Sequence, residues 1–497
     1  MAPATTATSM LRVRADSQID TDLAIVGGGP AGSAAACHFA RAGFRVWLID
    51  QRHFPRDKVC GDFVGPRALA ELDQLGLCTQ PSLRDANTIR RAALYLNGNE
   101  VLARPLPRVA GLRDYGLCLP RMLLDDAIVQ AAVAAGARLM EDTRVTGYET
   151  DETGVTLSYH GRTGPGRLRT RLLIGADGSA SLIARVLHGA QPARRDRIVA
   201  VRAYFDDVVG TTEQADLYFT SSSFPGYCWV FPTGTSSANV GVGVLLEAWP
   251  SSRQQLGQLF ADLIACDPAI RQRLAHATMR GKAVGWPLTT FNPRLPIIAN
   301  RVALIGDAAG LINPLNGEGI QYALLSARWS LEALQDALSS DTVSTAGLRR
   351  YATRVQAELR YDMALSRLIV DLTRNRALNP LWLSALDAIA KRAASDSAYY
   401  DVAAAVLAGI APAREMLAIP FLWYTVTQAA AMAGRAAASA TLHRPRRLVG
   451  SRAASTDNGG SILKYSVGHP VATLSWGVHC ALSLLELATQ MAIFGRE

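Results

Sequence analysis

The sequence predicts an α/β protein in which a domain built on a parallel sheet is joined to a second domain with a mixed sheet, followed by a helical C-terminal extension. Three observations support this fold class. At three widely separated places a short apolar strand runs into a turn of glycines and other small residues. The chain has 497 residues and is 49% hydrophobic, enough to bury a large core. The segments after the third turn are rich in alanine and read as helices.

The first of these turns joins a strand at 23–26 to a helix, and a second strand ends at Asp50. Its glycines follow the pattern G-x-G-x-x-G at Gly27, Gly29 and Gly32. The first glycine permits a tight turn, the second lets the backbone approach a pyrophosphate, and the third lets the helix lie close to the strand. The helix N-terminus then faces the phosphates, and Asp50 can accept hydrogen bonds from a ribose. The segment therefore predicts a βαβ unit that binds a dinucleotide.

The second and third turns each place an aspartate at the end of a strand. Asp177 follows the strand at 172–174, and Asp307 follows the strand at 301–305. Small residues come after both aspartates, so that a ligand can lie against the chain. An aspartate at the start of a helix is also a common N-cap, and that alternative stays open for Asp177.

Together the three turns resemble the FAD-binding pattern of the flavoprotein family that includes aromatic hydroxylases, flavin-dependent halogenases and geranylgeranyl reductases. The resemblance implies a glutathione-reductase-like, Rossmann-type domain that binds FAD non-covalently, with Asp307 contacting the ribityl chain. It also implies that the helix after 313–319 points its N-terminus at the flavin, and that Arg121 opens a helix beside the cofactor, although a surface arginine is the alternative. The predicted cofactor-binding residues are Gly27, Gly29, Pro30, Ala31, Gly32, Asp50, Arg121, Asp177, Gly306, Asp307, Pro314, Gly317 and Gly319.

A narrower resemblance rests on the segment 54–62, on P-G-Y-x-W-x-F-P at 225–232 and on NPLNGEGI at 313–320. These segments look like the geranylgeranyl reductase branch, and the likeness covers residues 20–370. The branch implies reduction of a C=C bond, with Cys60 near the flavin; a buried structural cysteine is the alternative. Tyr227 and Trp229 share one face of a strand and could line an apolar substrate cavity or pack in the core. The predicted catalytic residues are Cys60, Tyr227 and Trp229.

The expected function is thus an FAD-dependent reductase of a hydrophobic polyprenyl or polyene substrate, in specialised metabolism if the C-terminal extension marks a recruited enzyme. Phe63 stands where close relatives often carry a smaller residue, so the pocket near the flavin is expected to be reshaped. Two alternatives stay open: a flavin-dependent monooxygenase, and a polyketide-pathway [4+2] cyclase that keeps FAD as a structural, non-redox cofactor. Halogenation is disfavoured because W-x-W-x-I-P is absent. No second G-x-G-x-x-G occurs, so the electron donor, NAD(P)H or a protein, stays open.

The composition of the chain limits the classes of partner and the compartment that we expect. The net charge is +9, but the arginines are scattered and no interleaved basic and aromatic face is legible, which argues against nucleic acid. Seven widely spaced cysteines without a C-x-x-C pair argue against a zinc site or a disulfide framework and for a reducing, cytoplasmic compartment. The segment 471–494 is long enough to span a bilayer but carries a polar stripe. A packed or surface-lying helix, with peripheral membrane contact as one form, is favoured over a span.

These observations predict the following division of the chain. Residues 1–20 form a mobile N-terminal tail, and a discontinuous FAD-binding domain takes 21–80, 110–190 and 285–340. The substrate domain takes 81–109 and 191–284, and a helical C-terminal region takes 341–497, with a linker near 445–460.

Overall fold

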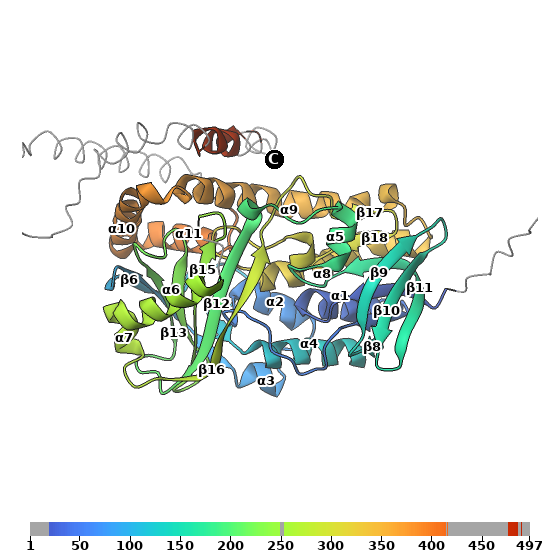
Figure 1. Ribbon diagram of the computed structural model, residues 1–497, viewed down its shortest axis with the longest axis horizontal. Helices are drawn as coiled ribbons and strands as arrows, with labels where there is room; N and C mark the ends of the chain where they lie inside the picture. The colour runs from blue at the N-terminus through green and yellow to red at the C-terminus, as the bar shows by residue number, and fades with distance from the viewer. Residues whose placement is uncertain (1–18, 249–252, 414, 416–475, 486–488, 490–497) are drawn as a thin grey trace, which may run out of the picture.

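The computed structural model describes residues 19–248, 253–413, 415, 476–485 and 489 (Figure 1). Several predictions concern segments outside these residues. They are the tail up to residue 18, the linker near 445–460, and most of the helix expected over 471–494.

The first sheet has β1 at its centre, in the order β17-β18-β11-β1-β2-β8. β1 pairs in parallel with β11 and β2, and β18 and β8 continue the parallel pairing on either side. Leu23 and Ile25 of β1 pack into a core shared with the helices, whereas Ala24 and Val26 pack into a core on the opposite face. Both faces of β1 are therefore buried, which explains its continuous apolar run. The strands are β1 (Thr21–Val26), β2 (Val46–Ile49), β8 (Arg138–Met140), β9 (Arg144–Thr150), β10 (Val155–Gly161), β11 (Gly164–Gly175), β17 (Ile298–Ala299) and β18 (Val302–Leu304).

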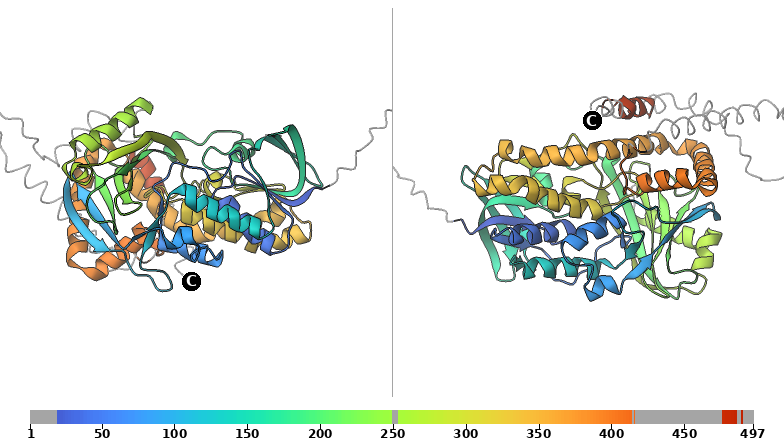
Figure 2. Two further views of the ribbon diagram at one scale, coloured as in Figure 1. Left: turned by 90° about the horizontal axis from the view of Figure 1, so that it is seen from below. Right: turned by 180° about the vertical axis from the view of Figure 1, so that it is seen from behind.

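Helices cover one face of this sheet, and an antiparallel ribbon lies toward one end of it. Helix α1 packs against α4 and α8, and α9 lies along α8 (Figure 2). At the right of Figure 1, β9 and β10 extend the long strand β11 by antiparallel pairing. The helices of this part are α1 (Pro30–Arg41), α2 (Pro66–Gln74), α3 (Pro81–Arg84), α4 (Arg121–Ala134), α5 (Leu182–His188), α8 (Ile320–Ser339) and α9 (Thr345–Thr373).

A seven-stranded sheet in the order β16-β12-β15-β14-β13-β5-β6 forms the second part. All neighbours in it are antiparallel except β13 and β5, so the sheet is mixed. Valines of β15 and leucines of α6 share a core on one of its faces. The elements are β5 (Arg91–Leu96), β6 (Asn99–Pro105), β12 (Arg197–Asp206), β13 (Gln214–Phe219), β14 (Tyr227–Pro232), β15 (Ala238–Leu245), β16 (Thr278–Thr289), α6 (Arg253–Cys266) and α7 (Pro268–Arg273).

A small antiparallel sheet of β3 (Phe63–Val64), β7 (Gly116–Cys118) and β4 (Asn87–Ile89) connects segments of both parts. The C-terminal region continues from α9 with α10 (Asn379–Ser395), which packs on β6, and α11 (Ser397–Leu407). Residues 476–485 are helical and contact α9 near Asp371. Among the described residues, no helix combines the length and the apolar character that crossing a membrane would need.

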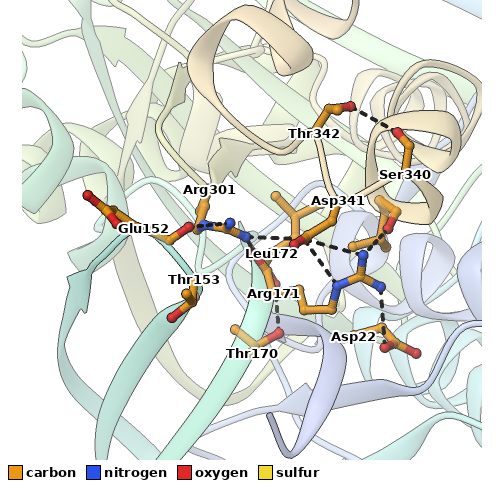
Figure 3. Close-up of polar contacts among 12 residues, drawn as sticks. Asp22, Glu152, Thr153, Thr170, Arg171, Leu172, Arg301, Ser340, Asp341 and Thr342 are labelled. Atoms are coloured by element: carbon orange, nitrogen blue, oxygen red, sulfur yellow. Dashed lines mark hydrogen bonds and ion pairs between the residues drawn. The ribbon is translucent and has the colours of Figure 1, made fainter. Parts of the chain in front are cut away.

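An arginine cluster fastens the first sheet at the edge where its parallel strands begin (Figure 3). Arg301, at a left-handed φ of +58°, donates to the carbonyl oxygens of Arg171 at 3.1 Å and Glu152 at 2.6 Å. Arg171 in turn donates to Asp341 at 3.3 Å and forms an ion pair with Asp22 at 3.7 Å. β1 and β18 begin at this cluster and β11 passes it at Arg171, so the glycine turns that follow these strands lie at the opposite edge.

Candidate cofactor and substrate site

The glycine turn after β1 has the geometry of a phosphate cradle. Gly27 has φ +107°, and a Cβ atom placed on it would lie 2.3 Å from the carbonyl oxygen of Ala176. A Cβ atom on Gly32 would lie 1.8 Å from the carbonyl oxygen of Gly27. At Gly29 the nearest atom to such a Cβ is a guanidinium nitrogen of Arg56, at 3.8 Å. The outer glycines are therefore required by packing, whereas Gly29 leaves open the space over the N-terminus of α1, where a pyrophosphate fits.

Asp50 lies beside this cradle at the end of β2. Its carboxylate accepts hydrogen bonds from the backbone N–H of Gly28 at 2.7 Å and of Arg52 at 2.8 Å. Arg56 lies 3.4 Å from the Asp50 carboxylate and 3.1 Å from that of Asp125. The orientation of Asp50 at the rim of the cradle suits a ribose acceptor. Arg56 places positive charge next to the cradle, and it was not among the predicted site residues although it lies in a segment that the sequence singles out.

Arg121 begins α4 and is not a surface residue, since only 4% of its side chain is exposed. Its guanidinium donates to both carboxylate oxygens of Asp125, at 2.6 and 2.8 Å, and it also bonds to Cys60. Burial lowers the pKa of Arg121, but the charge of Asp125 and the interactions with Asp125 and Cys60 together outweigh burial and raise it. The ion pair thus fixes a permanent cation beside Cys60.

The carboxylate of Asp177 binds groups of the protein itself, at the start of α5. Its carboxylate accepts from the hydroxyl of Ser181 at 2.5 Å and from the backbone N–H groups of Leu182 at 2.7 Å and Ile183 at 3.4 Å. These are the orphan donors at the start of α5, so the helix-cap alternative describes what the side chain does here.

Asp307 lies where the third turn meets the first. Its Oδ2 accepts from Lys58 Nζ and from the hydroxyl of Ser179, both at 3.3 Å. A Cβ atom on Gly306, which has φ +56°, would lie 2.7 Å from the Cβ of Ala31, so the two turns touch. A Cβ atom on Gly319 would lie 3.2 Å from Asp307 Oδ1. The structure therefore brings Ala31, Asp307 and the start of α8 together.

The turn before α8 caps that helix through the side chain of Glu318. Gly319 is the N-cap residue and provides no side-chain cap, and Gly317 has φ +73° with open space beside it. Pro314 precedes them in the same turn, and the backbone N–H of Gln321 donates to Glu318 Oε1 at 2.9 Å. Burial raises the pKa of Glu318 to about 7. Glu318 therefore caps the start of α8 with its own carboxyl group, at the positive end of the helix dipole.

The loop 57–62 spans from Asp307 to the seven-stranded sheet. Lys58 reaches Asp307, and Asp57 accepts from Arg202 of β12 at 2.6 Å. The carbonyl oxygen of Cys60 accepts from the amide of Asn239 on β15 at 2.7 Å. Burial raises the pKa of the Cys60 thiol, so the sulfur keeps its proton at neutral pH.

Tyr227, Trp229 and Phe231 face the loop 57–62 from β14, while Cys228 and Val230 point into the core behind them. Ring centroids lie 6.1 Å apart between Tyr227 and Trp229 and 6.2 Å apart between Trp229 and Phe231. A Cβ atom on Gly61 would lie 3.2 Å from the ring of Phe231 and 3.6 Å from Trp229 Nε1. The aromatic row therefore contacts the loop that carries Cys60.

Two further aromatic side chains and one hydroxyl define the ends of this row. Phe63 packs against Phe231 at 5.9 Å, and Phe219 against Tyr227 at 5.7 Å. The hydroxyl of Tyr227 donates to the carbonyl oxygen of Asn316 at 2.6 Å, which connects the row to the turn before α8.

Three further residues of this site escaped prediction: Asp62, Tyr204 and Asn239. Asp62 accepts from the Tyr204 hydroxyl at 2.6 Å and from the Asn239 amide at 2.8 Å. Asp62 lies in the segment 54–62, two positions after Cys60, and this position is a sequence signal for a site residue. Tyr204 and Asn239 lie in strands far along the chain and match no motif. Among the residues that the structure describes, no group of three or more metal-ligating side chains is present.

Comparison with known proteins agrees with this arrangement. The family described as FAD binding domain matches residues 20–356. The menaquinone reductase of Mycobacterium tuberculosis is 36% identical over 322 residues, which cover 63% of this chain and 76% of the relative. Digeranylgeranylglycerophospholipid reductase 2 of Methanopyrus kandleri is 30% identical over 384 residues, covering 73% of this chain and 90% of the relative.

Solved structures show the same fold. A geranylgeranyl bacteriochlorophyll reductase-like protein from Thermoplasma acidophilum superposes with a TM-score of 0.63 at 24% identity, covering 76% of this chain and 90% of that protein. The flavin-dependent brominase Bmp2 gives 0.64 at 17% identity, covering 78% and 93%. The predicted fold class, an FAD-binding α/β domain with a mixed sheet and a helical C-terminal part, is confirmed.

Proposed function

Because this chain belongs to the FAD-binding-domain family, in its geranylgeranyl reductase branch, we propose that it reduces a C=C bond in a hydrophobic polyprenyl or polyene substrate. The coarser activity, that of an FAD-dependent oxidoreductase, follows from membership of the family. The substrate and the direction of the chemistry are the proposal.

The residues around the glycine turn fit FAD. The open space at Gly29 would take the pyrophosphate, Asp50 would bind the ribose, and the positive end of the α8 dipole would face the polar edge of the flavin. When bound and reduced, FAD supplies a hydride. The chain itself must hold the substrate, exclude water and deliver a proton.

The observation that carries the proposal is a protonated thiol placed between the predicted flavin site and an apolar face. Lys58 ties the start of the Cys60 loop to Asp307, and Asp57 ties it to Arg202. Because burial raises the pKa of Cys60, the thiol is suited to donate a proton rather than to attack as a nucleophile. The positive charge of Arg121 stabilises the thiolate that remains.

The aromatic row favours an elongated apolar substrate. Tyr227, Trp229 and Phe231 present ring faces along one strand, with Phe219 and Phe63 at its ends. Two of the relatives are named as reductases of a menaquinone and of a geranylgeranyl lipid. A polyprenyl chain would bury its methyl groups against such rings at a favourable free energy of about 25 cal/mol per Å².

The compartment and the partners form part of the same proposal. A cytoplasmic enzyme that takes electrons from NAD(P)H or from a protein donor could meet its substrate at a membrane surface. The helix at 476–485 supports this contact because its exposed side chains include Val478, Leu482, Leu484 and Leu485. The chain's charge of +9 favours anionic lipid.

The test is the mass of the product formed from menaquinone and from a geranylgeranyl lipid by the flavin-loaded protein, with and without dithionite and with and without oxygen. We expect a gain of two hydrogens on the polyprenyl chain that depends on the reductant. A gain of one oxygen, or an isomer of unchanged mass formed without reductant, would contradict the proposal. The Gly29→Val protein serves as the flavin-free control.

A further inference from the structure

Asp62 is a fully buried residue in an unusual backbone conformation. It has a φ of +63° and no exposed surface. A left-handed conformation in a residue other than glycine costs free energy, although aspartate and asparagine tolerate it best. A buried carboxylate is costly as well. Two unfavourable features in one residue, two positions after Cys60, indicate that the surrounding structure holds it there.

The carboxylate of Asp62 is bound only by neutral donors. Oδ2 accepts from the hydroxyl of Tyr204 and from the amide of Asn239, and Oδ1 accepts from the backbone N–H of Arg121 at 3.3 Å. The nearest guanidinium groups have other partners: that of Arg202 bonds to Asp57, and that of Arg121 bonds to Asp125. Asp62 therefore has hydrogen bonds but no ion pair of its own.

The same contacts reach two of the three predicted catalytic residues, Cys60 and Trp229. The backbone N–H of Asp62 donates to Cys60 Sγ at 3.4 Å. Asn239 donates to Asp62 and to the Cys60 carbonyl oxygen, and its own carbonyl oxygen accepts from Trp229 Nε1 at 2.9 Å. One buried amide thus holds the thiol loop, the carboxylate and the indole in a single arrangement.

We propose that Asp62, held by Tyr204 and Asn239, is a positioning residue for Cys60, and that its negative charge adds to burial in keeping the thiol protonated. The inference rests on the proposed role of Cys60, but its test needs no turnover.

The charges around the site determine the direction of the effect. Burial raises the pKa of Asp62 to about 6, and the bonds from Tyr204 and Asn239 oppose that rise. The charged and titratable groups that face it are Tyr204 and Arg202 from β12, Arg121 from α4, Cys118 from β7 and Cys60 from its own loop. Above pH 6 the ionised carboxylate raises the pKa of Cys60, whereas below pH 6 this influence is lost.

The experiment measures the alkylation rate of Cys60 by iodoacetamide from pH 5 to 9 on the flavin-loaded protein, with the modified peptides identified by mass spectrometry. The exposed Cys266 in the same molecule is the internal reference. Asp62→Asn keeps a residue that tolerates positive φ and removes the charge. We expect Cys60 in this variant to react about tenfold faster at pH 8, one pKa unit being tenfold in thiolate, with Cys266 unchanged.

Tyr204→Phe is the second variant, because it keeps the charge and removes one donor to it. The inflection that Asp62 imposes on the Cys60 profile should then move to higher pH. Asp126→Asn, a carboxyl on the same helix as Arg121, is the matched control and should leave the profile unaltered. Identical Cys60 profiles in wild type and Asp62→Asn would overturn the inference. A shifted profile in a protein that reduces no polyprenyl chain would uphold it and reject the proposed function.

Discussion

Among single residues, Gly29 differs from the other two glycines of its turn. The space beside Gly27 and Gly32 is filled by other backbone atoms of the protein, whereas the space beside Gly29 is open to a ligand. Gly29→Val should therefore fold and purify without colour, since the side chain would occupy the place of the pyrophosphate. Absorbance at 450 nm and the thermal unfolding midpoint, Tm, measure the two effects. Gly32→Val should instead lower the stability by about 3 kcal/mol or more, because its side chain meets backbone atoms.

Gly257→Ala, on α6 with open space around it, is the control and should stay yellow. A Gly29→Val protein that carried a full complement of flavin would remove this turn from the cofactor site.

Cys60 can be tested by replacing sulfur. Cys60→Ala should lower kcat by about 10²-fold to 10⁴-fold, the usual contribution of a positioned general acid, with the flavin spectrum retained. Cys266→Ser, at an exposed cysteine, should keep the wild-type rate. Equal rates for Cys60→Ala and wild type would exclude the thiol as the proton donor.

Glu318 makes stability depend on pH. Its pKa is raised by burial to about 7 in the folded protein, against about 4.3 in an unfolded chain. Between these values the folded state holds a proton that the unfolded state has released, so the free energy of unfolding falls as pH rises. The loss is complete above pH 7 and amounts to about 4 kcal/mol at most.

Glu318→Gln keeps an acceptor for the backbone N–H of Gln321 and removes the dependence of stability on pH. Urea unfolding of the flavin-free protein should show the variant gaining stability over wild type at pH 8 but not at pH 4. The surface change Glu149→Gln is the control. A constant difference between the Glu318 variant and wild type across this range would show that Glu318 does not titrate as described.

The glycines, Asp50 and Asp307 could be predicted from sequence because each follows a strand at a fixed spacing. Arg56, Asp62 and Asn239 could not be assigned roles, because their partners come from other parts of the chain. Asn239 matters through Cys60 and Trp229, which lie in other segments. A spacing pattern within one segment carries no information about such contacts.

At the scale of elements, β11 shows how far an apolar run can predict a strand. The sequence predicts a strand at 172–174, and the structure extends it from Gly164 to Gly175. Only its last residues lie between two parallel neighbours and are apolar throughout. The first half pairs with β10, where Leu168 is buried and Arg167 is exposed. A strand that is buried on both faces is easy to predict from its continuous apolar run, and the first half of β11 lacks such a run.

The helix at 476–485 is docked through polar groups and displays apolar ones. Ser483 donates to Asp371 Oδ2 at 2.5 Å and Trp476 Nε1 to the Asp371 carbonyl oxygen at 3.0 Å, while 49% of Leu482 and 63% of Leu485 are exposed. The double change Leu482→Ser and Leu485→Ser should weaken binding to anionic phosphatidylglycerol vesicles by about tenfold. Sedimentation with the vesicles measures it.

Val133→Ser removes a comparably exposed apolar side chain on α4 and should leave vesicle binding as it is. Unchanged sedimentation of the double variant would assign the exposed leucines to another partner.

For the whole molecule, the cofactor site is a junction of three segments that are distant in the chain. The turns after β1, β11 and β18 meet there, and the loop 57–62 carries the connection on to the seven-stranded sheet. A ligand that binds only this assembled state stabilises the whole domain.

Removal of FAD should therefore lower Tm of the entire α/β body in one transition. Adding FAD at a hundredfold excess over its Kd should restore about 3 kcal/mol of stability. Calorimetry of the stripped and reloaded protein measures this, with FMN, which lacks the adenosine half, as the control. A separate transition for the seven-stranded sheet that FAD leaves unmoved would show that the loop 57–62 does not couple the two parts.

The arginine cluster at the opposite edge of the first sheet has a consequence for how such a protein can change. Arg171, Arg301 and Asp341 fasten the strands where they begin, away from every residue assigned to the flavin or the substrate (Figure 3). A library of variants confined to the loops at the far edge would therefore leave these fastenings intact. New substrate preferences could be selected in those loops while the protein continues to accumulate in the cell. Randomising the arginine cluster instead would mainly lower the yield of folded protein.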